Sequence, residues 1–123
     1  MIQREVYKYK AEVVRVVDGD TVDAMVDLGF NIFRKIRIRL YGIDTPETRT
    51  RDLEEKERGL AAKDRLIEIL KTTNNQVVLE SHGVGKYGRC IGELWYSDNE
   101  LSIQEQLILE GHGVRYTGGS SLH

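Results

Sequence analysis

The chain has 123 residues, of which 40% are apolar and 31% are charged, and its formal net charge is −2. This length and composition predict one domain with its own core, covering residues 1–123 with a flexible tail from about residue 117. The only cysteine, Cys90, excludes an intramolecular disulfide, and no apolar stretch is long enough to cross a membrane.

The N-terminus carries Arg4, Glu5, Lys8 and Lys10 and lacks the apolar stretch of a secretory signal. We therefore expect an intracellular or phage-encoded protein, or a secreted protein whose signal has been removed. A monomer is expected, with a dimer as the alternative, and no contact with a membrane is expected.

The first part of the chain predicts three strands. Tyr7–Val17 and Thr21–Leu28 are rich in Val, Tyr and Thr, and the Asp-Gly turn between them predicts a hairpin. Phe30–Tyr41 predicts a third strand, reached through a turn at Leu28-Gly29. Basic and apolar residues alternate in its second half, which places the basic side chains on one face.

A sharp corner follows this strand. The run Arg39 to Glu47 reads Arg-Leu-Tyr-Gly-Ile-Asp-Thr-Pro-Glu. Gly42 allows backbone angles that other residues resist, and Pro46 fixes its own φ and restricts the residue before it. We therefore predict a rigid corner that presents Asp44 and Glu47.

The rest of the chain predicts a helix, two short strands and a second helix. Residues 48–52 are expected to form a flexible loop, after which Asp52 and Glu55 predict a capping box and a helix to about Lys71 that Asn74-Asn75 ends. The strands are predicted at Gln76–Ser81 and Arg89–Tyr96. A helix capped by Ser102 with Glu105 and terminated by Gly111 completes the order.

Three charged motifs suggest chemistry on a phosphodiester. Asp20, in the first hairpin turn, and Asp44 would make a pocket of hard oxygen ligands suited to Ca²⁺ or Mg²⁺. Lys86-Tyr87-Gly88-Arg89 adds a second guanidinium to that of Arg39. Two arginines and a dication would neutralise a pentavalent phosphate, so the residues predict a nuclease.

In order and spacing these three motifs resemble the staphylococcal nuclease (thermonuclease) family, from about Glu12 to Tyr116. The resemblance implies an α+β, mainly β fold, a five-stranded OB-type Greek-key barrel with about two helices. It also implies cleavage of DNA and RNA at the 5′ side of the phosphodiester to leave 3′-phosphates, with Ca²⁺ rather than Mg²⁺ as the cofactor.

The resemblance also implies roles for single residues. Arg39 and Arg89 match phosphate-binding arginines, and Glu47 matches the carboxylate that orients or deprotonates the attacking water. The metal-binding positions correspond to Asp20, Asp44 and the main-chain carbonyl of Thr45. The substrate-binding positions correspond to Lys86, Tyr87 and, as the nearest candidate for a tyrosine that packs on the base, Tyr116.

Two features depart from that family. The mildly acidic chain differs from usual unspecific nucleic-acid binders, so we expect a basic cleft on an acidic body, with modest affinity that weakens in salt. The chain also ends soon after Tyr116, so the family's additional C-terminal helix is missing or minimal.

Each motif alone also has a non-catalytic interpretation: an ordinary hairpin turn, a solvated strand residue, a surface turn or a packing aromatic. For the whole chain the alternatives are a silent OB module that binds single-stranded nucleic acid or a protein, and an inhibitory phage protein. The three histidines show no spacing typical of a zinc site, and we give none of them a catalytic role: His82, His112 and His123.

Overall fold

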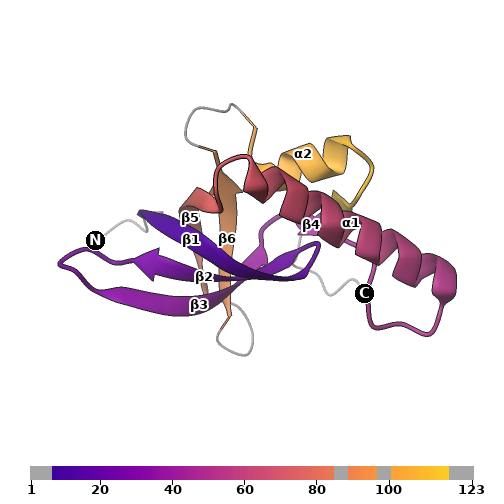
Figure 1. Cartoon of the computed structure of the whole chain (residues 1–123), viewed down its shortest axis with the longest axis horizontal. Helices are drawn as coiled ribbons and strands as arrows, with labels where there is room; N and C mark the ends of the chain where they lie inside the picture. Colours follow the sequence, from indigo (N-terminus) through magenta and orange to yellow (C-terminus); the bar gives the residue numbers. More distant parts are fainter. Residues whose placement is uncertain (1–6, 85–88, 97–100, 117–123) are drawn as a thin grey trace, which may run out of the picture.

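The computed structural model describes residues 7–84, 89–96 and 101–116 (Figure 1). Its strands β1 (Tyr7–Asp18), β2 (Thr21–Asp27), β3 (Phe33–Leu40), β6 (Cys90–Trp95) and β5 (Gln76–Val84) close into a barrel in that spatial order. All neighbours are antiparallel except β3 and β6, which are parallel. This closed barrel confirms the predicted five-stranded, mainly β α+β fold.

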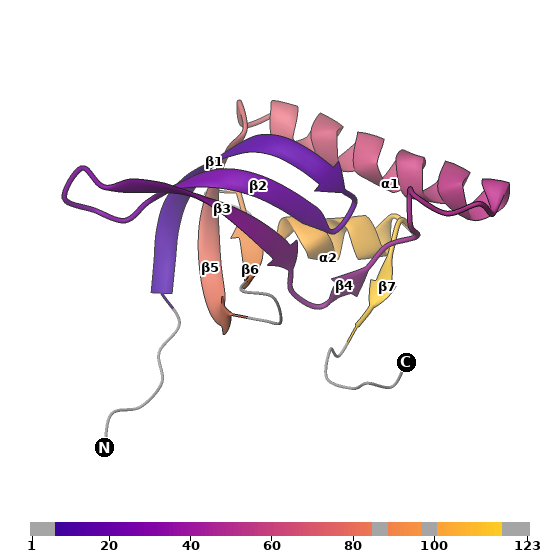
Figure 2. The same cartoon turned by 90° about the horizontal axis from the view of Figure 1, so that it is seen from below.

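Two helices and a small second sheet complete the structure. Figure 2 shows α1 (Leu53–Lys71) and α2 (Ile103–Leu109) on one side of the barrel, beside β4 (Ile43–Asp44) and β7 (Val114–Arg115). These last two strands pair antiparallel. Neither was predicted, since two residues are too few to show the alternation of a strand. No helix in the described part of the chain is long and apolar enough to cross a membrane.

The barrel core follows the alternation of the sequence. On β3 the side chains of Ile38 and Leu40 are buried, whereas those of Arg37 and Arg39 point outward. Leu66, Ile69 and Leu70 of α1 and Leu107 of α2 extend this core. The inward residues thus fix the register of β3, and with it the outward direction of its arginines.

The third strand begins later than predicted, at Phe33 instead of Phe30. Gly29, Phe30 and Asn31 have φ angles of 87°, 55° and 62°, which a strand cannot hold. They form a turn in which Ile32 donates its backbone N–H to the Gly29 carbonyl at 2.9 Å.

The predicted capping boxes are only half present. The Asp52 carboxylate accepts from the N–H groups of Glu54 and Glu55 as predicted, but Glu55 does not return the bond. Its carboxylate instead accepts the N–H of Glu47 at 3.3 Å. Ser102 likewise accepts from Glu105 N–H, whereas the Glu105 carboxylate binds Arg115. Both glutamates are thus used for contacts with other segments of the chain.

Candidate active site

Arg39, at the end of β3, lies between two carboxylates. Its Nη2 is 3.6 Å from Asp20 Oδ2 and 3.4 Å from Asp44 Oδ1. Its Nη1 donates to the carbonyls of Leu40 at 2.9 Å and Ile43 at 2.8 Å. The guanidinium is therefore held by the backbone of the turn after β3, and two carboxylates far apart in sequence converge on one of its nitrogens.

Asp20 is fixed by the turn between β1 and β2. Its Oδ2 accepts the N–H of Thr45 at 3.1 Å, and its Oδ1 accepts the Thr21 hydroxyl at 3.0 Å. The turn packs so closely on α1 that a Cβ at Gly19 would lie 2.8 Å from Ala62 Cβ. This packing presses Asp20 against the corner that carries Asp44 and Thr45, and it joins two motifs that the sequence predicted separately.

The corner itself is anchored from α2. Gln104 is 2% exposed, and its Nε2 donates to the carbonyls of Tyr41 at 3.1 Å and Gly92 at 3.3 Å. Its Oε1 accepts the N–H of Leu94 at 3.1 Å. The amide thus replaces strand pairing at the point where the chain leaves β3 and turns toward Asp44. Gly42 has φ +81°, which confirms that the turn needs a glycine.

Glu47 lies beside this cluster on the wall of a hollow of about 790 Å³. The same hollow is lined by Asp44 and Thr45, by Arg58 from α1, and by the segment 111–114. Helix α1 approaches the corner closely, because a Cβ at Gly59 would lie 2.6 Å from the Glu47 carbonyl oxygen. The helix thus fixes the main chain that carries Glu47.

Residues 48–52 are tied to the barrel at one point. The Thr48 hydroxyl donates to Asp18 Oδ1 at 2.5 Å, next to the turn that holds Asp20. The loop that we expected to be flexible therefore has a polar contact at its start, although nothing apolar anchors it.

The remaining predicted site residues differ in how far the structure places them. Arg89 directly precedes β6, whose Ile91 pairs with Arg39, so by strand alternation Arg89 shares the outer face of Arg39. Its Nε is buried and has no hydrogen-bond partner among the described residues. The Arg39 Cζ lies 5.6 Å from the centre of the Tyr116 ring. Lys86 and Tyr87 lie outside the described residues.

Arg37 has a different role from Arg39. Its guanidinium forms a two-pronged bond with Asp23, Nε to Oδ1 at 2.8 Å and Nη2 to Oδ2 at 3.2 Å. Asp23 is 6% exposed, and the bond from Arg37 lowers the pKa of its carboxyl. Arg37 is therefore more than a solvated strand residue, because it compensates a buried charge.

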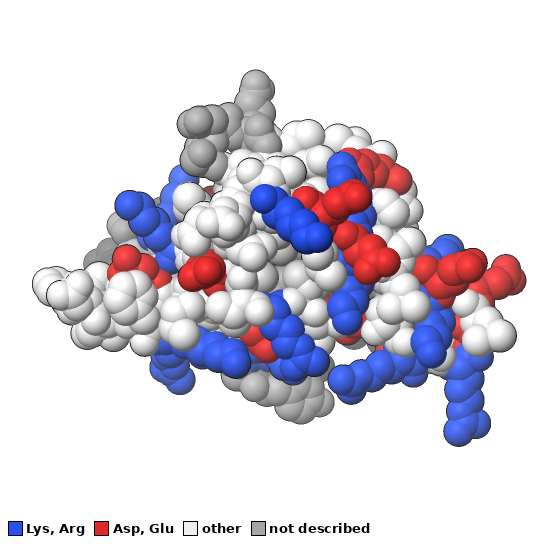
Figure 3. Space-filling model, in the orientation of Figure 1, with Lys and Arg blue, Asp and Glu red and all other residues white. Residues whose placement is uncertain are grey.

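The surface carries both signs of charge. In Figure 3, Lys and Arg side chains lie along the lower edge, under β3 and the segment that leads into α1, while acidic side chains are scattered over the rest of this face. This view shows a basic edge and not a basic cleft, and the hollow beside Glu47 is lined by Asp44 and Glu55 as well as by Arg58, so the expected basic cleft on an acidic body stays a prediction.

Sequence reasoning missed several residues that the fold brings to notice. Arg58 and His112 line the hollow beside Glu47. Glu80, His82 and Glu93 form a group whose ligand atoms all lie within 4.8 Å of one another. The Glu-x-His spacing on a strand would have placed two of these on one face, but the third depends on strand register.

Comparisons with known proteins give the family of the chain. The model of the family described as "Staphylococcal nuclease homologue" matches residues 37–121. Protein ParB of Escherichia coli is 33% identical over 70% of this chain and 41% of its own length. The micrococcal nuclease of Shigella flexneri is 33% identical over 71% of this chain and 42% of its own length. The thermonuclease of Staphylococcus intermedius is 34% identical over 75% of this chain and 52% of its own length.

The chain thus spans about two fifths of the length of the first two relatives. The match nevertheless includes the corner, its carboxylates and both arginines proposed for phosphate binding. Because the family model covers well over half of the chain, the protein belongs to the family of staphylococcal nuclease homologues.

Proposed function

We propose that this chain is a Ca²⁺-dependent phosphodiesterase that hydrolyses DNA and RNA at the 5′ side of the phosphodiester and leaves 3′-phosphates. Membership of the family supports a nuclease-type function. The observation that carries the proposal is the convergence of Asp20 and Asp44 on one nitrogen of Arg39, next to the hollow that Glu47 lines.

The residues present fit a hard dication. Asp20 is 9% exposed, and two separate carboxylates converge where a single guanidinium nitrogen now lies. With the Thr45 carbonyl they would supply three oxygen ligands and leave positions for water and phosphate. A bound Ca²⁺ would act as a Lewis acid on a phosphoryl oxygen.

The protein residues would then divide the remaining work. Glu47 would orient or deprotonate the attacking water, which requires a carboxylate beside the phosphate. Arg39 and Arg89 would hold the non-bridging oxygens as negative charge grows, a task for which a planar guanidinium fork is better suited than an ammonium group. The unpartnered Nε of Arg89 supports this role, since a buried donor without a partner is costly.

The test is digestion of an end-labelled single-stranded DNA with Ca²⁺, with Mg²⁺ and with a chelator. We expect cleavage that requires Ca²⁺, yields 3′-phosphates and falls steeply in Glu47→Ala. Glu57→Ala is the matched control, because Glu57 is an exposed carboxylate on α1 outside the hollow. Binding of the DNA without cleavage under every metal condition would instead establish the silent OB module.

A further inference from the structure

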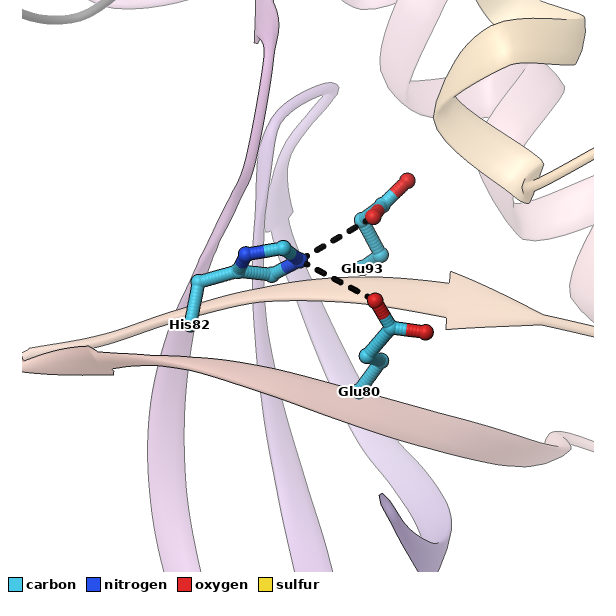
Figure 4. A group of neighbouring side chains, drawn as sticks. All are labelled: Glu80, His82 and Glu93. Carbon is cyan, nitrogen blue, oxygen red and sulfur yellow. Dashed lines mark hydrogen bonds and ion pairs between the residues drawn. The ribbon is translucent and has the colours of Figure 1, made fainter. Parts of the chain in front are cut away.

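Three side chains on the outer face of the barrel converge on one point, beside Tyr41 in the turn that follows β3. His82 Nε2 lies 3.0 Å from Glu93 Oε1 and 3.4 Å from Glu80 Oε2, and Figure 4 shows both carboxylates directed at this nitrogen. The residues come from the neighbouring strands β5 and β6. We propose that Glu80, His82 and Glu93 form a second metal site, which binds a transition-metal dication such as Zn²⁺.

The strand register gives the first reason. Glu80 and Glu93 are directly opposite each other in the antiparallel pair of β5 and β6. Like charges at such positions destabilise a sheet unless a cation lies between them. Lys8 of β1 lies opposite Glu80 in register, but among the described residues neither carboxylate has a lysine or arginine within ion-pair distance, and His82 is the group that faces both.

The geometry gives the second reason. With metal bonds of about 2.0–2.2 Å, the ligand atoms of a tetrahedral Zn²⁺ site lie about 3.4 Å apart. The distance from Nε2 to Glu80 Oε2 already has this size, and the distance to Glu93 Oε1 is 3.0 Å, that of the hydrogen bond which a metal would replace. All three ligand atoms lie within 4.8 Å of one another, so a small movement of one carboxylate would complete the triangle.

The imidazole is held in place for this role. Its ring stacks on Tyr41 with centroids 4.2 Å apart and planes 3° from parallel. A break in the β5–β6 register between Ser81 and Val84 interrupts the ladder next to His82, and such bulges change the direction of a side chain. The ring therefore needs little further ordering to bind a metal.

The chemistry of the three ligands favours a transition metal over Ca²⁺. An imidazole nitrogen suits Zn²⁺ and its neighbours in the first transition row, whereas Ca²⁺ takes oxygen ligands. Two carboxylates and a neutral imidazole balance the charge of a dication, but a protonated imidazole would leave one negative charge. The side chains are 19–22% exposed, which leaves access for the metal and for a water in the open position.

The experiment measures Zn²⁺ affinity by competition with a chromogenic chelator and records the visible spectrum of the Co²⁺ form. An Asp44→Asn background weakens metal binding at the candidate active site, so the outcome does not depend on the proposed nuclease activity. We expect one equivalent of Zn²⁺, and we expect His82→Gln to weaken binding at least about tenfold. Glu57→Gln, which removes an exposed carboxylate of α1 outside the hollow, is the matched control and should bind like the background chain.

Glu93→Gln is the second variant, because it removes one ligand charge and keeps the stack of His82 on Tyr41. Circular dichroism checks that each variant is folded, and if His82→Gln does not fold, the Glu93→Gln result decides. Weaker Zn²⁺ binding and altered Co²⁺ bands in the folded variants would support the site. A background chain that binds no Zn²⁺, or folded His82→Gln and Glu93→Gln chains that bind it unchanged, would overturn the proposal.

Discussion

Arg37 and Arg39 lie two residues apart on the same outer face of β3, yet their surroundings differ. In the middle of the strand, both prongs of the Arg37 guanidinium match the carboxylate of Asp23. At its end, Arg39 has no such match and shares one nitrogen between Asp20 and Asp44 at 3.6 Å and 3.4 Å. Arg39 is nevertheless the more buried side chain, at 17% exposed against 48% for Arg37.

This difference separates a structural ion pair from a site whose charged groups can still bind a ligand. In a two-pronged ion pair the guanidinium and the carboxylate bond each other, and neither has groups left to bind a ligand. A guanidinium nitrogen shared between two carboxylates gives neither of them a two-pronged bond, and a dication with a phosphate can rearrange all three groups. We therefore expect changes at the end of β3 to affect function and changes in its middle to affect stability.

The largest effect should separate the two arginines directly. With a lysine at position 39 the two-pronged donor is lost, and we expect Arg39→Lys to lower the cleavage rate about 10²–10³-fold. Arg37→Lys, the matched control, should change the rate little and should lower the melting temperature. Measured turnover and thermal unfolding of both variants check this, and equal rate losses would refute the division between the two sites.

A second large effect should come from a glycine that touches no substrate. Gly59→Ala would press a methyl group against the carbonyls of Pro46 and Glu47, at 2.7 Å and 2.6 Å. The corner must shift, and a displacement of this kind can lower the rate of cleavage by about 10²-fold. The cleavage assays of Gly59→Ala include Lys56→Ala, on the same helix, as the control.

Helix propensity alone gives the opposite expectation for Gly59→Ala. Alanine is favoured over glycine inside a helix by about 1 kcal/mol. A variant with a higher melting temperature and unchanged cleavage would therefore show that α1 does not position Glu47.

The third effect concerns the anchor of the corner. Gln104→Leu would leave the buried N–H of Leu94 without its acceptor, and we expect unfolding in urea to show a loss of about 1–3 kcal/mol. The bond to the Tyr41 carbonyl is lost as well, so the cleavage rate should fall by more than it does in Arg37→Lys. Gln106→Leu, a less buried amide on α2, should cost less. A Gln104→Leu chain as stable as the parent would mean that water replaces the amide.

The sequence predicted the strands and the corner from local patterns, whereas the barrel was predicted from the resemblance to a family. Alternation gives the faces of β3, and Gly42 and Pro46 mark the turn. The two-residue strands β4 and β7 could not be predicted, since their pairing depends on residues 43–44 and 114–115 meeting in space. Glu55 was assigned to a capping box because the sequence does not show that α1 passes beside the Glu47 main chain.

The candidate site shows the same limit. Asp20, Arg39, Asp44 and Glu47 could be selected from charge and turn chemistry, and their catalytic roles stay predictions. Alternation with apolar residues is the same for Arg37 and Arg39, so it could not show that Arg37 would form an ion pair with Asp23. That pair depends on register, which sets Asp23 opposite Arg37. Register also brings Glu93 opposite Glu80, so the group around His82 was missed.

The smallest effect tests how much stability a two-pronged ion pair contributes when it is partly exposed. Arg65 of α1 binds Glu110 after α2 through Nε at 2.6 Å and Nη2 at 2.9 Å, and this pairing lowers the pKa of Glu110 to about 2. A carboxyl whose pKa is lower in the folded state stabilises the fold above its unfolded pKa. That stabilisation is lost as the pH falls from about 4.5 to about 2.

We therefore expect Glu110→Gln to lower the melting temperature slightly at pH 7 and to flatten its decline between pH 4.5 and pH 2. Thermal unfolding of both chains across this range is the measurement, and an NMR titration of Glu110 gives its pKa directly. Both side chains of the pair are 31% exposed, so solvent screening keeps the effect small. If the two pH profiles are parallel, a partly exposed two-pronged ion pair between arginine and a carboxylate contributes no measurable stability. The stabilising role of Arg37 would then come from the burial of its partner, Asp23.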